Sequence, residues 1–512
     1  MKWKPPAPTR IVAAAFAVYT AALYLNLAYL ITGNAMLPNG AGFALAILFT
    51  AAKTAEAMLK CLSTKRLPLP PLIGMVAAGL LLRNCSNMPL SDNVPFFGYD
   101  FKSWSVLLRS LALAVIMLRA GLGLDLRKLR TLGAITARLA FLPCIFETAA
   151  VGVTSHYLLG LPASWAGMLG FTVAAVSPAV LVPGMLELQD RNLGTNKGIP
   201  TLMMAAASFD DVLAVAGFGV CLTLVRQTEF GDDSASSLAW LVMKAPVEIC
   251  AGCVAGLVIG AASALLGAEH VNVAVHTLAT LGGAFVCVLG SRKIGFSSGG
   301  ILAAVVIGST ISEFWRRTDR ISQLEQVRSR VQKLWGDVAQ PALFGLLGAA
   351  VDLRAVRSKD VGLGCALIAI GLVVRLLATR LALVKSRFSS REALFICISW
   401  LPKATVQAAV GGIALDIVME NGYWLAQDRA ELVLMISLLV ILITAPLGAI
   451  GIAVSAPKLL SHGVSEVAAA NCNEGENLRA VRTERAIHHP ESQVGHKHSL
   501  AKEEPSSTVG TV

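Results

Sequence analysis

Charged residues are scarce in this sequence, and their scarcity excludes a soluble protein. Asp, Glu, Lys and Arg make up 15% of the 512 residues, whereas soluble globular domains carry about 25%. Close cysteine pairs are scarce too: the ten cysteines are scattered, and the one near pair, Cys250 and Cys253, has no second pair and no histidine beside it. We therefore expect no disulfide, no transition-metal site and no cofactor.

Apolar residues are abundant, and they gather in solid blocks of about 18–29 residues, each long enough to cross a bilayer as a helix. A membrane β-barrel is excluded, because its strands alternate polar and apolar residues. The blocks predict an all-α polytopic membrane protein of about fourteen transmembrane helices. We place them at 10–31, 40–59, 68–83, 104–121, 131–159, 164–189, 198–226, 238–267, 271–290, 294–311, 332–350, 359–385, 391–417 and 430–455.

The loop charges predict how the chain is oriented. An even number of helices puts both termini on one face, and the loops on that face carry most of the Lys and Arg, so we expect both termini to be cytoplasmic. The net charge of +11 then requires no nucleic acid partner, because basic loops suit anionic lipid headgroups on the cytoplasmic side. Residues 456–512 are polar, and we expect a disordered cytoplasmic tail there.

Two loops resemble each other and indicate an inverted repeat of seven helices. Residues 121–130 and 348–357 share a pattern of Gly, Asp, Leu and Arg, and their aspartates, Asp125 and Asp352, lie 227 residues apart, which corresponds to seven helices. Seven is odd, so the two copies lie on opposite faces of the membrane, as in inverted-repeat transporters.

Two further features recur in corresponding places. A single charge in an apolar helix follows each loop, Glu147 in the first half and Arg375 in the second. A proline then interrupts an apolar helix in each half, at Pro178 and at Pro402. Paired broken helices are typical of a binding site at the membrane midplane, because proline frees backbone groups to face an ion.

Asp210 and Asp211 lie about twelve residues from either end of their predicted helix. Placing carboxylates there costs several kcal/mol, which indicates a functional site. Carboxylate, carbonyl and hydroxyl oxygens bind hard cations, so one site can hold a proton or a cation such as Na⁺ or Li⁺, but not both at once. Glu147 and Arg375 are expected to pair, and Lys403 is expected to compensate the broken helix ends or the aspartates, with Asp210 as its standing partner.

Four runs carry a family resemblance: GFTVAAVSPAVLVP at 170–183, GIPTL at 198–202, SFDDVLA at 208–214 and WLPKATVQAA at 400–409. They resemble the animal subfamily B sodium/proton exchangers of the cation/proton antiporter superfamily, over roughly residues 10–455. The resemblance implies the fold of the bacterial sodium/proton antiporters, with two crossing proline-broken helices, and a homodimer of elevator-type protomers. We assign 1–120 and 231–350 mainly to the dimerisation domain, and 121–230 and 351–455 to the ion-transporting core.

The resemblance also implies residue roles. The paired ion-binding aspartates of the family fall on Asp210 and Asp211, and its unwound carbonyl region falls on Val176 and Ser177, with Thr405 as a further candidate ligand. Its Glu–Arg pair falls on Glu147 and Arg375, and its crossover lysine falls on Lys403. Electrogenic bacterial relatives have a lysine where this chain has Arg375, so we expect electroneutral exchange of one Na⁺ or Li⁺ for one proton.

Other functions fit the sequence less well. An intramembrane aspartyl protease uses two aspartates on different helices with a Gly-x-Gly-Asp motif, whereas here the pair is adjacent. Prenyl-transferring enzymes use Asp-Asp-x-x-Asp, and the last acid is missing after Asp211. We therefore expect no enzyme. A sodium-coupled organic-anion symporter on a similar scaffold is the nearest alternative, and a channel suits buried charge pairs less well.

Overall fold

A computed structural model of the chain describes Gly33 and residues 40–64, 68–85, 99–124, 126–229, 238–266, 272–294 and 296–461. The predicted helix at 10–31, Asp125 of the first repeated loop and the tail from 462 onward lie outside these residues.

The described elements are helices, as the apolar blocks predict. They are α2 (Ala41–Leu62), α3 (Leu72–Asn84), α4 (Tyr99–Gly123), α5 (Leu126–Leu159), α6 (Ala163–Ala174), α7 (Pro178–Asp190), α8 (Ile199–Glu229), α9 (Leu238–Leu266), α10 (Val273–Lys293), α11 (Ser297–Arg317), α12 (Ile321–Leu334), the π-helical turn η3 (Trp335–Ala339), α13 (Gln340–Ala349), α14 (Ser358–Ala382), α15 (Ser390–Ser399), α16 (Thr405–Val410), α17 (Ile413–Asn421), the 3₁₀ turn η4 (Trp424–Ala426) and α18 (Gln427–Leu459).

The described part of the chain contains nine helical segments that are long and apolar enough to cross a membrane. One of them runs through the break between α6 and α7, and α3 is apolar but shorter. The membrane-spanning all-α class is therefore confirmed, and the count of fourteen helices stays a prediction.

The predicted helices 294–311 and 332–350 imply a loop between them, but the structure has no loop over that whole region. The region forms the end of α11 and then α12, which continues through η3 into α13. Leu324, Val327 and Val331 are buried on one face of α12, while most of its other residues are exposed or half-buried. The boundaries were wrong because they follow solid apolar blocks, and an amphipathic helix has an apolar residue only every third or fourth position.

The two apolar segments that contain Pro178 and Pro402 are broken where predicted. The unwound segment 175–177 separates α6 from α7, and 401–404 with Trp400 separates α15 from α16. Pro178 is the first residue of α7, a position where its missing N–H costs nothing. The predicted helix 391–417 has a second interruption at Gly411 and Gly412, so it comprises three short helices, α15, α16 and α17.

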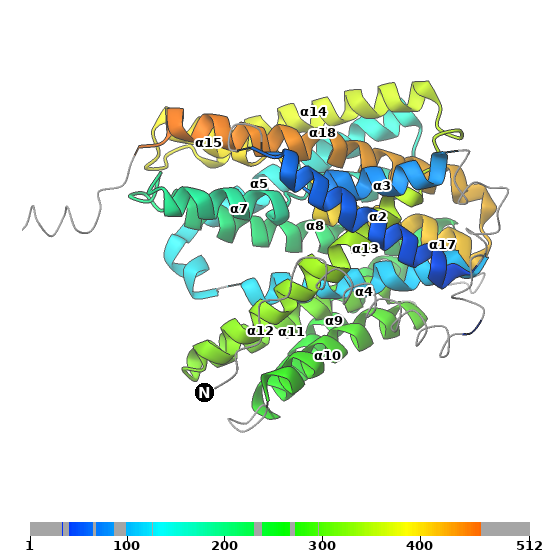
Figure 1. Cartoon of the computed structure of the whole chain (residues 1–512), viewed down its shortest axis with the longest axis horizontal. Helices are drawn as coiled ribbons and strands as arrows, with labels where there is room; N and C mark the ends of the chain where they lie inside the picture. Colours follow the sequence, from blue (N-terminus) through cyan, green and yellow to red (C-terminus); the bar gives the residue numbers. More distant parts are fainter. Residues whose placement is uncertain are drawn as a thin grey trace, which may run out of the picture. The chain divides into compact units, whose positions relative to one another are not determined.

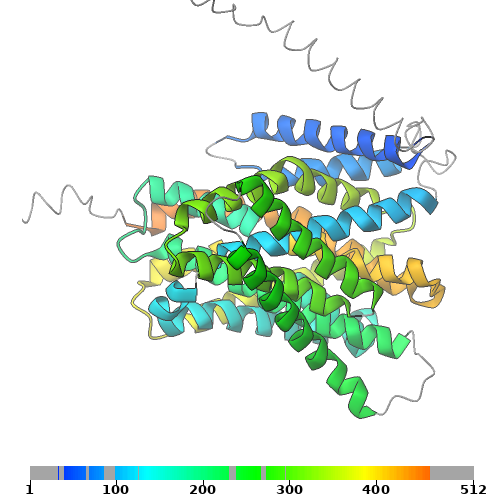
Figure 2. The ribbon, with the colours of Figure 1, turned by 90° about the horizontal axis from the view of Figure 1, so that it is seen from below.

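The helices pack in two groups around α4 and α8. In Figure 1, α14, α15 and α18 lie along one side of the bundle with α5, and α9, α10, α11 and α12 lie along the opposite side, next to α4. In Figure 2, α2 and α3 cover one flank of the bundle. The α5, α6 and α8 helices contact one another, and α11 contacts α4, α9 and α10.

Candidate functional site

Asp210 is fully buried in the middle of α8, and both of its carboxylate oxygens have partners. Oδ2 accepts a hydrogen bond from the backbone N–H of Val176 at 2.7 Å, and Oδ1 accepts one from Nη2 of Arg375 at 3.1 Å. The Val176 N–H is available because helix α6 ends at Ala174, and the next residue, Ala175, is already extended. The broken helix therefore supplies a donor that a continuous helix would have used internally.

Asp211 is the next residue, and its surroundings differ. Its side chain is 5% exposed, and its Oδ1 has no hydrogen-bond partner among the described residues. Arg119 of α4 interacts with it electrostatically. A buried carboxylate oxygen without a partner is costly, so a proton or a cation would stabilise it.

Arg375 is the centre of the charge network. Its Nη1 donates to Oε2 of Glu147 at 2.5 Å, and its Nε donates to the carbonyl of Trp400 at 2.8 Å. Together with the bond to Asp210, these contacts use all three guanidinium nitrogens, and Arg375 is fully buried. A planar fork of donors in fixed geometry suits this task better than a single ammonium group.

Lys403 contacts Glu147 and not Asp210, so the expected pairing of Lys403 with Asp210 is wrong. Its Nζ lies 2.6 Å from Oε2 of Glu147, the same oxygen that accepts from Arg375. Asp210 is instead paired with Arg375 at 3.1 Å. The crossing of the broken helices places Lys403 at the end of α6, next to Glu147 of α5. The sequence gives no distance between these elements, so it could not predict this contact.

The carbonyls at the broken end of α6 are capped by side chains from the second half of the chain. Nε2 of Gln407 donates to the carbonyls of Thr172 and Ala175, each at 2.9 Å. Lys403 donates to the carbonyl of Ala174 at 2.8 Å, and Arg375 donates to the same oxygen. The C-terminal end of a helix is electronegative and has unsatisfied carbonyls, so two cations and an amide stabilise it there.

The two unwound segments also contact each other directly. The N–H of Ser177 donates to the carbonyl of Pro402 at 2.8 Å, and the hydroxyls of Ser177 and Thr405 lie 3.4 Å apart. Pro178 and Pro402 thus flank a crossing point where Val176, Ser177 and Thr405 come together. This crossing and the adjacent carboxylates of α8 offer carboxylate and hydroxyl oxygens, the ligands that Na⁺ and Li⁺ prefer.

Four residues of this region were missed from the sequence. Gln407 could not be recognised from the sequence, because burying a neutral amide in an apolar helix costs less free energy than burying a charge and does not by itself indicate a site. Arg109, Arg119 and Asp416 could have been found, because each is a charge within a predicted apolar helix, as Glu147 is. Arg109 and Asp416 form a buried ion pair of their own.

Comparison with known proteins identifies a family. Residues 52–456 match the family described as "Sodium/hydrogen exchanger, transmembrane". The chain is 40% identical over 433 residues to mouse sodium/hydrogen exchanger 9B2, covering 84% of this chain and 76% of that protein. It is 37% identical over 444 residues to human sodium/hydrogen exchanger 9B1, covering 84% and 81%.

A solved structure shares the fold. The sodium proton antiporter MjNhaP1 from Methanocaldococcus jannaschii, at pH 8, superposes with a TM-score of 0.63 at 20% identity, covering 82% of this chain and 97% of that one. At this identity the likeness concerns the fold alone.

Proposed function

The chain belongs to the sodium/hydrogen exchanger family, and we propose that it exchanges Na⁺ or Li⁺ for protons across a membrane, with Asp211 as the carboxylate that binds each in turn. The observation that carries this proposal is the difference between two adjacent carboxylates. Asp210 has partners on both oxygens, whereas an oxygen of Asp211 has none among the described residues. One carboxylate positions the site, and the other remains available for the transported ion.

Competition for Asp211 would couple the two ions. A bound cation stabilises the ionised carboxylate, and a bound proton neutralises it, so occupancy by one disfavours the other. Val176, Ser177 and Thr405 are proposed to complete the site, through the backbone freed by Pro178 and Pro402 and through the two hydroxyls 3.4 Å apart. Glu147, Arg375 and Lys403 keep the surrounding charges balanced.

We propose that transport follows an elevator-type alternating access. In this scheme residues 121–230 and 351–455 form the moving core, and 1–120 and 231–350 form the dimerisation domain of a homodimer. The crossing of α6–α7 with α15–α16 supports this division, because both broken helices belong to the core and are tied together by Ser177 and Pro402. The presence of one broken helix in each half of the chain also supports the proposed fold, in which fourteen helices form two inverted repeats of seven.

We further propose that exchange is electroneutral. Arg375 cannot deprotonate at working pH, and it holds Asp210 at 3.1 Å. Lys403 is held by Glu147 at 2.6 Å. One carboxylate is left to alternate between one proton and one monovalent cation, which moves no net charge.

Both termini are proposed to be cytoplasmic, in a plasma or organelle membrane, with anionic lipids at the basic cytoplasmic loops. The known members of the family are named as exchangers, which argues against an aspartyl enzyme. A sodium-coupled organic-anion symporter differs in requiring an organic substrate.

Reconstitution into liposomes that contain a pH-sensitive dye tests this proposal. Steps of Na⁺ and of Li⁺ on the outside should each drive protons out of the lumen without any organic anion in the buffer. The variant Asp210→Cys/Asp211→Cys should remain folded and lose this response. Proton movement that needs an added organic anion would favour the symporter, and undiminished exchange by the double variant would refute the site.

A further inference from the structure

A cavity of about 760 Å³ opens at one end of the helical bundle. It is lined by the ends of several helices and by the loop that follows α13; the helices are α3, α4, α13, α14, α17 and α18. Five carboxylates line it, against three arginines; the acids are Asp352, Asp360, Asp416, Asp428 and Glu431. With both termini cytoplasmic, these helix ends lie on the opposite, outer face. An excess of carboxylates raises the local concentration of cations, so the cavity suits an outer vestibule.

The inner wall of the cavity holds a buried ion pair. Arg109 of α4 donates through Nε to Oδ2 of Asp416 of α17 at 3.2 Å, and its Nη2 bonds the other carboxylate oxygen. Arg109 is 9% exposed and Asp416 is 3% exposed. In the proposed division of the chain, α4 belongs to the dimerisation domain and α17 to the core, so this bidentate pair joins the two.

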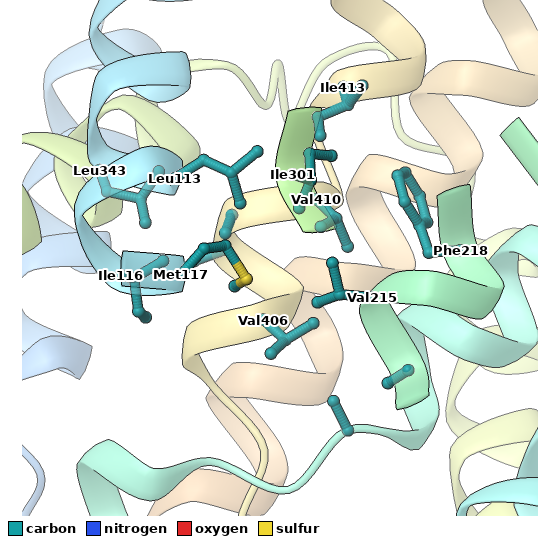
Figure 3. Close-up of a cluster of buried hydrophobic side chains, with 14 of the residues drawn as sticks. Leu113, Ile116, Met117, Val215, Phe218, Ile301, Leu343, Val406, Val410 and Ile413 are labelled. Carbon is teal, nitrogen blue, oxygen red and sulfur yellow. The ribbon is translucent and has the colours of Figure 1, made fainter. Parts of the chain in front are cut away.

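Buried apolar side chains, which we call the apolar layer, occupy the helical turns next to this pair and next to Asp211. Figure 3 shows Leu113 and Met117 of α4 together with Val215 and Phe218 of α8 and Val406, Val410 and Ile413 of the α16–α17 segment. Val215 is about one helical turn beyond Asp211 on α8, and Ile413 is about one turn before Asp416 on α17. A cation in the cavity would thus meet first the ion pair and then the apolar layer before it reached Asp211.

We infer that the Arg109–Asp416 pair is the latch that keeps the ion site closed to the outer cavity. This inference rests on the proposed function. When the core moves along α4 to open the site outward, the two side chains must separate and the apolar layer must part. The charges then become exposed to the water-filled cavity, which can solvate them, so the pair favours the closed state without making opening prohibitive.

The test measures access to a cysteine placed beneath the latch. Ile413→Cys is introduced, the protein is placed in lipid nanodiscs, and the rate of labelling by a hydrophilic maleimide is followed by mass spectrometry of the segment between Lys403 and Arg429, which contains no native cysteine. Ile413 is buried, so labelling should be slow. Adding Arg109→Gln or Asp416→Asn should raise the rate about tenfold or more, and the charge exchange Arg109→Asp/Asp416→Arg should return it toward the starting value.

A matched control is the ion pair between Arg429 of α18 and Glu229 of α8, which joins two elements of the proposed core. Glu229→Gln should leave the labelling rate unchanged, and it keeps Arg429 as the end of the measured segment. Should a single variant fail to fold, the double neutral variant Arg109→Gln/Asp416→Asn decides, because it leaves no unpaired buried charge. Unchanged labelling in folded variants, or an equal rise with Glu229→Gln, would overturn the latch.

The failure of the latch and that of the proposed function are distinguishable. If labelling is unchanged while the wild-type protein exchanges Na⁺ for protons in liposomes, the latch alone is refuted. If the wild-type protein moves no protons in response to Na⁺ or Li⁺, the proposed function is refuted whatever the labelling result.

Discussion

At the residue scale, the candidate site consists of five buried ionisable groups whose pairing is unequal. Arg375 contacts both Glu147 and Asp210, and Lys403 shares Glu147 with it. The two cations therefore pair with two of the carboxylates, with Oε1 of Glu147 accepting no hydrogen bond among the described residues, and Asp211 is left outside this set. The charge pattern explains how a strongly ionised cluster can lie in an apolar bundle while one group remains free to bind an ion.

The double-mutant cycle of Glu147 and Arg375 tests this network. Arg375→Ala leaves the Asp210 carboxylate without its cation, and removing one partner of a buried pair costs about 3–5 kcal/mol. The variant Glu147→Ala/Arg375→Ala should cost less than the sum of the two single changes, by about 0.5–3 kcal/mol. Denaturant unfolding in detergent measures the difference. Strictly additive losses would mean that the two side chains do not interact.

The sequence could predict most of the charged residues of the site and few of their contacts. Glu147, Arg375, Asp210 and Asp211 stand out because each is a charge in an apolar block, and such charges need partners or a function. The partner of Lys403 could not be predicted, because it depends on how α5 and the two broken helices are placed in space. Gln407 was missed because a neutral amide leaves no such signal.

At the element scale, the broken helix α6 depends on side chains from another part of the chain. Gln407 donates to three of its last carbonyls, those of Thr172, Val173 and Ala175. Because these carbonyls are buried, a cap from within the protein replaces the water that would satisfy them at a surface. The geometry of the crossing is thus set by one half of the chain capping the other.

Gln407→Leu should destabilise the protein by about 1–3 kcal/mol, the usual cost of leaving buried polar groups without partners. Thermal unfolding in detergent measures the change. Gln189→Leu is the control, since the amide of Gln189 is less buried and makes one long bond of 3.3 Å to Thr201. A loss for Gln407→Leu no larger than that for Gln189→Leu would contradict the capping role.

Close contact between α3 and α13 requires glycine at two positions. A Cβ on Gly79 would lie 2.0 Å from the carbonyl oxygen of Gly345, and a Cβ on Gly348 would lie 2.1 Å from that of Val76. Gly79→Ala should therefore separate the helices and cost about 1–3 kcal/mol. Gly282→Ala in α10, where a Cβ would meet nothing within 4 Å, should be neutral or stabilising. Equal melting temperatures for the two variants would contradict this packing.

The apolar blocks of the sequence predict helix boundaries well where a helix is apolar on all sides. They predict them poorly where a helix is amphipathic or interrupted by glycine. The breaks after α6 and α15 were predicted, because Pro178 and Pro402 interrupt solid blocks. Helix α12 was not predicted, because its three buried residues are separated by polar ones. The interruption at Gly411 and Gly412 was also missed, since two glycines in an apolar segment are compatible with a continuous membrane helix.

At the scale of the whole molecule, the helices that carry the candidate site contact a second group of helices around α4, α9 and α11. The Arg109–Asp416 pair and the apolar layer of Figure 3 lie where these two groups meet. In the proposed scheme, this arrangement closes the path to the ion site on the side of the acidic cavity. Alternating access in that scheme requires relative motion at this contact, while the α6–α7 and α15–α16 crossing moves as one unit.

Electroneutral exchange has an electrical test on the whole molecule. A step of Na⁺ applied to proteoliposomes on a solid-supported membrane, with equal pH on both sides, should give no sustained current, because one cation replaces one proton. The same liposomes should show proton movement by dye fluorescence. A sustained current that reverses with membrane potential would contradict the single-carboxylate scheme and require a second titrating group.

The central claim is that Asp211 binds the transported cation and the proton, and its most direct test is exchange by a single isosteric variant. Asp211→Asn keeps the size of the side chain and removes its charge, so Na⁺-driven proton movement in proteoliposomes should fall to the level of protein-free vesicles. Asp319→Asn, at an exposed position between α11 and α12 and away from both the site and the acidic cavity, should exchange at the wild-type rate. Exchange by Asp211→Asn at a rate comparable to that of Asp319→Asn would contradict the account.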